Sequence, residues 1–359
     1  MLLPKPQNIK VERYVGGLSK FKKIYNPIKL SANESALGAS PKAIKAFVKD
    51  KKNIFIYPES DSNSLRDILS KKFNIESSRI ICGAGSDQIF DLTCKLFLKS
   101  GDEVIVTEFG FIMHRIYASL HGAKVLLAQE INYKANVEEI LKKVTDKTKV
   151  VFIANPNNPT GTYLSKSEML KLRKELRSNI LLVVDDAYFE FMNMDDFRSG
   201  LDLFKNSANV LITRTFSKIY GLAGLRLGWG YASKEIIDAM YQIKNPFNVN
   251  RAALSASIEA IKDDDWTKRA IDHNTLWTKN IFTILEENKI ETNRPTANFF
   301  LMNFDKTKIS SNTVFEKLAN KRLILRKMEQ YKIPNSLRLT IGNKKTNEHF
   351  IKTIRDILN

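Results

Sequence analysis

Residues 149 to 161 read KVVFIANPNNPTG, a mostly apolar run that leads directly into a segment of turn-forming residues. A short apolar run bounded by turn residues is typical of a strand that is buried on both faces, as in a parallel sheet. Prolines and asparagines favour a sharp turn where the strand ends. The stretch therefore predicts a sheet strand whose carboxyl end carries a tightly turned loop.

The same alternation of short apolar runs with amphipathic helical segments extends from about residue 40 to residue 232. Further candidate strands are RIIC (79–82), EVIVT (103–107), KVLLA (124–128), ILLVVD (180–185), NVLIT (209–213) and LRLGWGYA (225–232). Ser40 before Pro41 suits the start of one helix, and Ser165 with Glu168 forms a capping box for another. The pattern predicts an α/β fold, with a mainly parallel seven-stranded sheet between helices.

The pattern changes towards the C-terminus. Long helices are expected over residues 252–290, with a break near Asp263, followed by shorter strands and helices. Those shorter candidates are strands at 297–304, 323–326 and 337–342, and helices at 312–320 and from about 346. We expect an N-terminal arm (1–30), a large domain (31–250) and a smaller α+β domain (251–359) to which the arm contributes.

Composition narrows the class of protein. The net charge is +18, from 57 Lys and Arg against 39 Asp and Glu. The basic residues are spread over helix faces, and no nucleic-acid-binding motif accompanies them, so we expect no nucleic-acid partner. Apolar runs stay below the roughly eighteen residues of a membrane helix. The N-terminus lacks the apolar core of a secretory signal. We expect a cytoplasmic protein without a membrane partner.

The cysteines and histidines do not have the spacing of a metal site. Cys82 and Cys94 are expected to lie too far apart to form a disulfide, and we predict that both are reduced and buried. The four histidines stand singly along the chain. No metal ligand set is therefore predicted.

Ligands of an open α/β sheet gather at the carboxyl ends of its strands. The segment GAGSDQ (83–88) follows one strand and opens a helix, an arrangement that suits a phosphate. Asp185 ends another strand, where a buried carboxylate requires a cationic partner. These strand ends predict one ligand site along the edge of the sheet.

The segment TFSKIYGLAGLRLG (215–228) contains an isolated cation, Lys218, among small and apolar residues. A lysine in a partly desolvated pocket loses its proton more easily, and its neutral amine can then attack an aldehyde. Arg226, eight residues later, suits a phosphate dianion. A lysine, the acidic Asp185 and a phosphate site together suggest pyridoxal 5'-phosphate (PLP) as cofactor.

The chain resembles the fold-type I, PLP-dependent aminotransferases, and within them the histidinol-phosphate aminotransferases. The resemblance covers essentially the whole chain, and the order and spacing of its segments are specific. The matching segments are KLSANES (29–35), Tyr57-Pro58, GAGSD (83–87), NNPTG (157–161), VDDAY (184–188), TFSK (215–218), GLAGLR (221–226), PTANF (295–299) and SLRLTIG (336–342).

The resemblance implies roles for individual residues. Lys218 holds PLP and moves a proton between the substrate Cα and the cofactor, and Asp185 pairs with the ring nitrogen. Asn158 and Tyr188 hydrogen-bond the 3'-oxygen of the ring, and Phe109 stacks on the ring face. The phosphate end is cradled by Gly85, Ser86, Asp87, Thr215, Ser217 and Arg226.

The resemblance also implies a homodimer and a substrate site. Tyr57 would reach the phosphate from a neighbouring subunit. Arg338 would clamp the substrate α-carboxylate, and Asn33 lies in the matching KLSANES segment and would contact substrate. Tyr14 and Arg326 would bind the substrate phosphate. The chain departs from the family pattern in YVGG (14–17), in Asn33-Glu34-Ser35-Ala36 and in Tyr331-Lys332-Ile333-Pro334.

The expected activity is transamination of small-molecule amino-acid and oxo-acid substrates in histidine biosynthesis. Histidinol phosphate and 2-oxoglutarate would be converted to imidazole-acetol phosphate and glutamate in a reversible cycle of two half-reactions, through the cofactor. The departures leave open an aromatic amino-acid aminotransferase and a threonine-phosphate decarboxylase. A PLP-binding transcription regulator would need a DNA-binding module, for which the arm leaves no room. An NAD-linked dehydrogenase would need an acidic pattern after the glycine loop that is missing.

Overall fold

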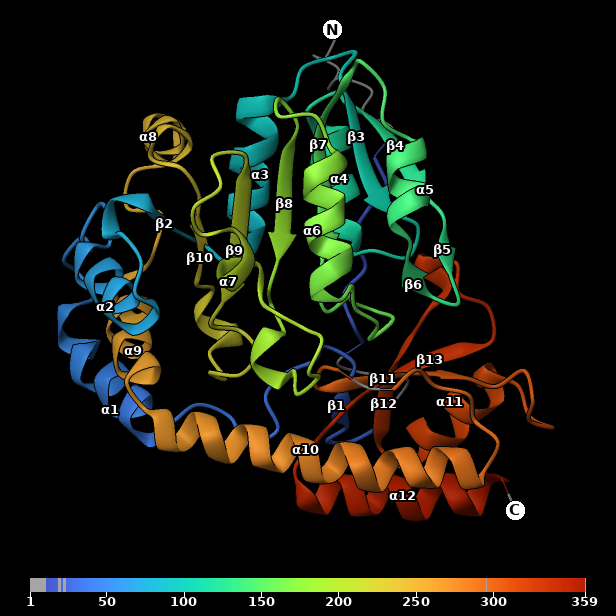
Figure 1. Cartoon of the computed structure of the whole chain (residues 1–359). Helices are drawn as coiled ribbons and strands as arrows, with labels where there is room; N and C mark the ends of the chain where they lie inside the picture. The colour runs from blue at the N-terminus through green and yellow to red at the C-terminus, as the bar shows by residue number, and fades with distance from the viewer. Residues whose placement is uncertain (1–10, 19–20, 22–23, 295, 359) are drawn as a thin grey trace, which may run out of the picture.

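The computed structural model describes residues 11–18, 21, 24–294 and 296–358. It contains a seven-stranded sheet and a four-stranded sheet (Figure 1). The large sheet consists of β2 (Ile80–Gly83), β3 (Glu103–Thr107), β4 (Lys124–Ala128), β7 (Thr148–Ala154), β8 (Leu181–Asp185), β9 (Val210–Thr215) and β10 (Gly228–Tyr231). The small sheet consists of β1 (Ile28–Leu30), β11 (Phe299–Asn303), β12 (Leu323–Lys327) and β13 (Ser336–Thr340). A separate hairpin is formed by β5 (Glu130–Ile131) and β6 (Lys134–Ala135).

Helices alternate with these strands. They are α1 (Pro41–Asp50), α2 (Asn63–Phe73), α3 (Ser86–Phe97), α4 (Ile112–Leu120), α5 (Val137–Lys142), α6 (Lys166–Glu175), α7 (Gly200–Phe204), α8 (Lys234–Ile243), α9 (Arg251–Ile261), α10 (Asp264–Glu287), α11 (Ser311–Asn320) and α12 (Lys344–Leu358). The predicted caps are present: the Ser40 side chain accepts from the Ala43 amide, and Ser165 forms the capping box with Glu168. The sequence therefore determines where both helices begin.

The large sheet has the strand order β2-β10-β9-β8-β7-β3-β4. Strand β10 runs antiparallel to both of its neighbours, β2 and β9, and the other pairs are parallel. All strands except β10 therefore end at the same edge of the sheet. In register, Ala154 pairs with Asp185, and Asp185 pairs with Thr213, so three of these strand ends lie side by side.

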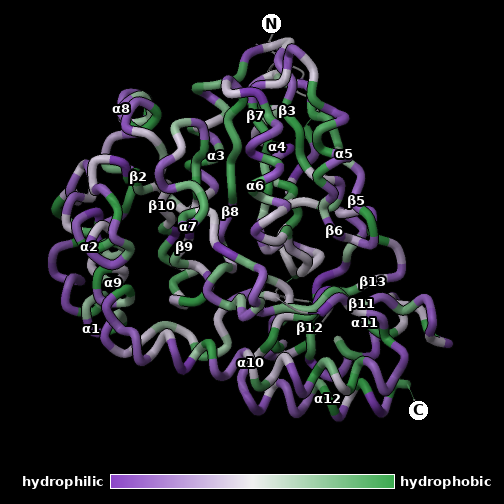
Figure 2. The backbone as a smooth tube through the Cα atoms, in the orientation of Figure 1, coloured by the Kyte–Doolittle hydropathy of each residue, from purple (hydrophilic) through white to green (hydrophobic). Residues whose placement is uncertain are grey.

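Both faces of the large sheet are covered. On β7, Val151 and Ile153 belong to one buried cluster, while Val150 and Phe152 belong to another. The first cluster includes side chains of α2, α5, α6, α7 and α9, and the second includes side chains of α3, α4 and α8. Figure 2 shows hydrophobic colour along β8, whereas hydrophilic and hydrophobic residues alternate along α10 and α12. The apolar runs of the sequence are thus strands buried between helices.

The small sheet has the order β1-β12-β13-β11 and packs on its own apolar cluster. Side chains of α10, α11 and α12, including Trp277, Phe315 and Phe350, belong to this cluster. Strand β1 pairs in parallel with β12, so the last three residues of the predicted arm complete the sheet. The long helix α10 runs beneath both sheets in Figure 1.

The seven predicted strands and the predicted long helices are confirmed, and all strands but one begin and end within two residues of their predicted bounds. The strand expected at 225–232 begins only at Gly228, because residues 223–225 form a short 3-10 helix and Arg226 has a left-handed φ of 53°. Cys82 and Cys94 are buried and unbridged, as predicted. No described helix combines the length and apolar character that crossing a membrane requires.

The division into an arm and two domains stays a prediction. Residues 1–10, 19, 20, 22 and 23 of the arm, and Pro295 of PTANF, lie outside the described residues. The buried side chains of α9, such as Ala253 and Leu254, belong to the apolar cluster of the large sheet, although the sequence boundary at residue 250 assigns them to the smaller domain.

Candidate active site

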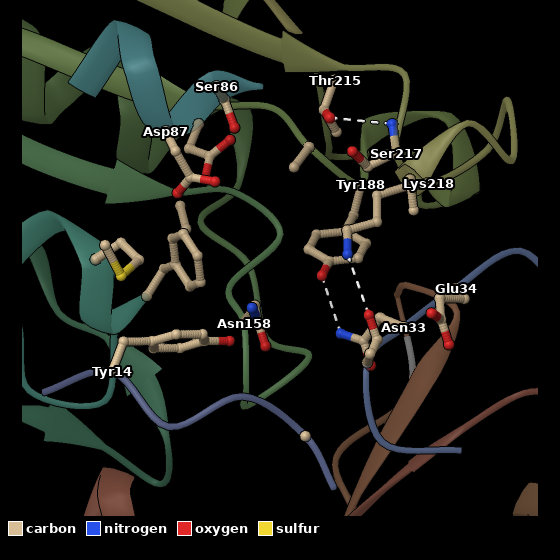
Figure 3. A pocket seen from close by; sticks show the side chains of 18 of the residues that line it. Tyr14, Asn33, Glu34, Ser86, Asp87, Asn158, Tyr188, Thr215, Ser217 and Lys218 are labelled. Carbon is tan, nitrogen blue, oxygen red and sulfur yellow. Dashed lines mark hydrogen bonds between the residues drawn. The ribbon is translucent and has the colours of Figure 1, made fainter. Parts of the chain in front are cut away.

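A pocket of about 420 Å³ lies at the edge of the large sheet where the parallel strands end. Its lining comes from the segments that follow β2, β3, β7, β8 and β9, from β12 and β13, and from Tyr14 and Gly17 of the arm. Figure 3 shows Lys218 and Tyr188 on one side of this pocket and Tyr14 on the other. The site is where a parallel sheet is expected to collect a ligand.

The amine of Lys218 is held inside this pocket. Its Nζ donates to the Ala32 carbonyl at 3.4 Å and lies 5.4 Å from the ring centroid of Tyr188. Within the described part of the chain, Lys218 has no carboxylate partner within 4.0 Å. Burial, and secondly the positive charge of Arg338, lower the pKa of Lys218 to about 8. A lysine with such a pKa is partly neutral near pH 7 to 8, and the neutral amine can attack a carbonyl or accept a proton.

Asp185 provides a buried carboxylate at the end of β8, with 5% of its surface exposed. Thr213 Oγ1 donates to its Oδ1 at 3.3 Å, and His114 Nε2 lies 3.7 Å from its Oδ2. The His114 ring stacks on Phe152 with the centroids 4.8 Å apart, which fixes its position. A buried carboxylate with these neutral or weakly basic neighbours is suited to a cationic ligand group.

Tyr188 is joined to the small sheet through Asn33. Asn33 Nδ2 donates to the Tyr188 hydroxyl at 2.9 Å, and Thr340 Oγ1 donates to Asn33 Oδ1 at 3.2 Å. Asn33 has a φ of 55°, a left-handed conformation that asparagine tolerates better than most residues. Burial raises the pKa of Tyr188 to about 12, so its hydroxyl stays protonated and can donate a hydrogen bond into the pocket.

The start of α3 and the segment after β9 form an anion site. Arg226 Nη1 donates to Ser217 Oγ at 3.2 Å, and its Nη2 lies 3.2 Å from Asp87 Oδ2. The Ser217 amide donates to Thr215 Oγ1 at 3.1 Å, and Ser86 begins α3 beside them. Hydroxyl groups, a guanidinium and the N-terminus of a twelve-residue helix together favour a phosphate.

Gly85 keeps this anion site open. Its φ is 78°, and a Cβ at this position would lie 2.6 Å from Arg226 Nη2. A side chain would therefore push the guanidinium away and would also strain the backbone. Burial raises the pKa of the neighbouring Asp87, whose Oδ1 is buried without a hydrogen-bond partner among the described residues.

Two buried arginines face the other side of the pocket. Arg326 and Arg338 are register partners on β12 and β13, and their exposed fractions are only 7% and 5%. Arg338 donates to Asn158 Oδ1 and to the Ser31 carbonyl, at 3.0 Å for the latter. Arg326 Nη2 donates to the Val15 carbonyl at 2.6 Å. Neither forms an ion pair with a described residue, so the two guanidinium charges repel each other and would attract an anion.

The structure brings most of the predicted site residues together. The pocket lining includes Lys218, Asp185, Asn158, Tyr188, Ser86, Asp87, Thr215, Ser217, Arg226, Tyr14, Asn33, Arg326 and Arg338. Gly85 lies directly behind Arg226 rather than in the lining. Tyr57 is 76% exposed, and its ring stacks on Phe247 with the centroids 4.5 Å apart, outside the pocket.

Phe109, the residue predicted to stack on the cofactor ring, does not line the pocket, whereas Phe111 does. Gly110 N donates to the Thr107 carbonyl at 3.0 Å, which makes a tight turn after β3. That turn directs Phe109 away, where its ring contacts Tyr133 with the centroids 5.5 Å apart. Phe109 alone is predicted from the sequence, because the turn that separates the two phenylalanines of FGF is not evident there.

Sequence reasoning also missed residues that line the pocket or support it. Tyr331 and Tyr117 belong to the lining, and His114 stands behind Asp185. His114 lies in the first turn of α4, three residues after Phe111. A histidine at the start of a helix that follows a predicted strand was the signal that could have indicated it. Among the described residues, no group of three or more His, Cys, Asp or Glu side chains could hold a metal ion.

Comparisons with known proteins agree with this geometry. The model of the family described as aminotransferase class I and II matches residues 25–354. The chain belongs to the class I and II aminotransferase family. This aminotransferase is 54% identical to the histidinol-phosphate aminotransferase of Pelagibacter ubique (strain HTCC1062) over 100% of both chains. It is 38% identical to that of Maricaulis maris (strain MCS10), over 98% of this chain and 97% of the relative.

A solved structure has the same fold as this aminotransferase. The histidinol-phosphate aminotransferase from Sinorhizobium meliloti, crystallised in complex with pyridoxal-5'-phosphate, superposes with a TM-score of 0.84. The alignment covers 91% of this chain and 90% of that chain at 22% identity. The expected resemblance to the histidinol-phosphate aminotransferases and the expected fold class are both confirmed.

Proposed function

We propose that this aminotransferase uses PLP to transfer an amino group from histidinol phosphate to 2-oxoglutarate, reversibly and in two half-reactions, as a step of histidine biosynthesis. The names of the relatives at 54% and 38% identity support this proposal. The observation that carries it is the pair of adjacent, buried guanidiniums of Arg326 and Arg338, neither of which has a carboxylate partner among the described residues. A phosphate group, with close to two negative charges, matches two guanidiniums.

The residues of the pocket fit PLP. Because Gly85 has no Cβ, the space beside Arg226 stays free. Next to it, Asp87 Oδ1 is buried and has no hydrogen-bond partner among the described residues. Ser86, Thr215, Ser217 and Arg226 would hold the cofactor phosphate. Asp185 would hold the ring nitrogen, Phe111 would contact the ring face, and Lys218 would hold the aldehyde carbon.

When bound, PLP supplies a ring that draws electrons away from the substrate Cα once the Cα proton has left. Asp185 keeps a proton on the ring nitrogen, because a buried carboxylate strongly favours a cation beside it. Lys218 Nζ would move a proton between the substrate Cα and the cofactor carbon that carried the aldehyde, which its lowered pKa of about 8 permits near neutral pH. The protonated hydroxyl of Tyr188 and the amide of Asn158 orient the ring oxygen.

The two arginines serve both half-reactions. Histidinol phosphate carries a phosphate-bearing carbon where an amino acid carries its carboxylate, so Arg338 and Arg326 would face the same phosphate. In the second half-reaction the α-carboxylate of glutamate would lie against Arg338. Tyr14, whose ring centroid lies 5.7 Å from the Arg326 guanidinium carbon, would close the phosphate site from the arm.

The proposal includes a homodimer and a cytoplasmic location. An exposed apolar patch, defined here as Ile54, Phe55, Tyr57 and Phe247, lies outside the pocket, and the first three side chains are 81%, 82% and 76% exposed. Apolar surface of this kind favours burial against another protein. A second copy that covers this patch would bring Tyr57 to the phosphate end of the other site, as the resemblance implies.

The proposal is tested by mixing the PLP-loaded protein with one amino donor at a time, without an oxo acid. Histidinol phosphate and glutamate should each discharge the visible absorbance of the bound cofactor, and 2-oxoglutarate should restore it. Phenylalanine should react at least tenfold more slowly than histidinol phosphate, because it lacks the phosphate. Faster reaction with phenylalanine would instead indicate an aromatic amino-acid aminotransferase. Release of carbon dioxide from phosphothreonine would indicate a decarboxylase.

A further inference from the structure

One side chain connects the N-terminal arm to the substrate pocket. Gln330 lies between β12 and β13, directly before the segment Tyr331-Lys332-Ile333-Pro334 in which the chain departs from the family pattern. Its Nε2 donates to the Arg13 carbonyl at 2.9 Å, and its Oε1 accepts from the Val15 amide at 3.3 Å. The side-chain amide thus binds the backbone on both sides of Tyr14. Because the two anchors flank Tyr14, they hold this residue where it lines the pocket.

The same side chain contacts a substrate arginine. Gln330 Oε1 also accepts from Arg326 Nη2 at 3.4 Å, and that nitrogen donates to the Val15 carbonyl at 2.6 Å. The arm, the side chain of Gln330 and the guanidinium of Arg326 are therefore joined by one set of hydrogen bonds. Arg115 reinforces it, since its Nη2 lies 2.9 Å from Glu12 Oε2 and donates to the Gln330 carbonyl at 3.3 Å.

The neutrality of Gln330 matters for this arrangement. A carboxylate at the same place would neutralise Arg326 and compete with an anionic substrate. An amide oxygen accepts from the guanidinium and leaves its positive charge available. Arg13, Tyr14 and Val15 are exposed, so a few hydrogen bonds of modest net strength hold this part of the arm.

We propose, building on the proposed function, that Gln330 is a positioning residue that seats arm residues 13–15 over the pocket and orients Arg326 towards the phosphate of the substrate. A phosphate that binds Arg326 and Tyr14 stabilises the seated arm, because it interacts with that state more strongly than with the unseated one. Substrates without a phosphate gain less from Gln330. The residue therefore contributes to the preference for phosphorylated donors.

The first test is limited proteolysis of the full-length, PLP-loaded protein with trypsin, following cleavage after Arg13 by mass spectrometry. Histidinol phosphate should slow this cleavage in the wild type. Gln330→Ala should be cleaved faster and should show less protection by the ligand. Glu329→Gln is the matched control, because Glu329 is exposed and its one ion pair among the described residues is with Lys327, at 3.5 Å. Cleavage of Gln330→Ala at the wild-type rate would overturn the proposal.

The second test separates binding from chemistry. Gln330→Ala should raise KM for histidinol phosphate about tenfold and change kcat little, since two or three hydrogen bonds are lost outside the reacting atoms. Gln330→Glu should raise KM further, because it keeps the shape and neutralises Arg326. An unchanged KM in both variants, with unchanged melting temperatures, would overturn the proposal. If the wild type fails to use histidinol phosphate, the proposed function fails, while the proteolysis still decides whether Gln330 holds the arm.

Discussion

Arg326 and Arg338 are register partners on neighbouring antiparallel strands, and both are almost completely buried at the pocket. Like charges placed directly opposite each other on a sheet destabilise the fold. Each guanidinium is satisfied in part by carbonyl or amide oxygens, while Arg338 Nε is buried without a partner among the described residues. We infer that the pair is retained for the anion it binds and at some cost to stability.

This inference predicts opposite effects of one substitution on function and on stability. Arg326→Met should raise KM for histidinol phosphate roughly 100-fold, as expected for the loss of a charge-assisted hydrogen bond of about 3 kcal/mol. Its melting temperature in the absence of ligand should stay equal to that of the wild type or rise, because the repulsion between guanidiniums is gone. Steady-state kinetics and calorimetry check the two parts. A lower melting temperature together with an unchanged KM would contradict the inference.

His114 is predicted to position Asp185. His114→Phe keeps the aromatic stacking on Phe152 and removes the nitrogen that lies 3.7 Å from Asp185 Oδ2. We expect kcat to fall about tenfold with little change in KM, since the variant affects how Asp185 supports the cofactor and leaves the arginines intact. The pH dependence of the absorbance spectrum of bound PLP should also differ from that of the wild type.

Asp185→Asn should lower kcat more than His114→Phe does, on the order of 100- to 1000-fold, as for the loss of other groups that stabilise charge in an active site.

Lys218 is predicted to destabilise the PLP-free protein at neutral pH. Burial lowers its pKa to about 8 in the fold, against about 10.4 in an unfolded chain. Between these values the unfolded state binds more protons, so this residue makes stability increase as pH rises from about 8 to about 10.4. Lys218→Met should therefore raise the free energy of unfolding by about 1 to 3 kcal/mol at pH 7.

The gain from Lys218→Met should be much smaller at pH 10.5, where the wild-type amine is neutral in the fold and about half neutral in the unfolded chain. Chemical denaturation at the two pH values measures the difference. Lys45→Met serves as a control, because Lys45 is exposed on α1 and should show no such pH dependence. An equal effect of Lys218→Met at both pH values would show that its charge is not the cause.

The exposed apolar patch predicts the assembly state. Phe55→Glu places a charge in the patch and should convert the dimer into monomers in sedimentation experiments. Because Tyr57 is proposed to act across the interface, the monomeric variant should also bind PLP more weakly than the wild type does. Leu276→Glu is a matched control, since Leu276 is also an exposed apolar residue, 54% accessible, on α10. A wild-type protein that is monomeric at micromolar concentration would refute the homodimer.

Much of the fold could be predicted from the sequence, because strands buried on both faces leave uninterrupted apolar runs. The runs at β3 and β4 match their observed bounds, and the capping residues Ser40 and Ser165 mark helix starts. The strand at β10 begins later than predicted, because a 3-10 helix over residues 223–225 and the left-handed conformation of Arg226 precede it, and the apolar run does not indicate either. The side chains Lys218, Asp185 and Asn158 could be found because they follow predicted strands.

The remaining features depend on contacts between distant segments. Phe109 is predicted to stack on the cofactor ring, but after the turn at Gly110 it is Phe111 that lines the pocket. The pairing of Arg326 with Arg338 requires the register of β12 and β13. The link between Gln330 and the arm joins residues more than 300 positions apart, and no local pattern indicates it.

The most direct test of the account is to locate the cofactor on the chain. Borohydride reduction of the PLP-loaded protein, followed by trypsin and mass spectrometry, should place the pyridoxyl group on Lys218. Because a modified lysine resists trypsin, the labelled peptide should run uncut from Thr215 to Arg226, TFSKIYGLAGLR. A label on another lysine, or one spread over several lysines while Lys218 stays free, would contradict the account.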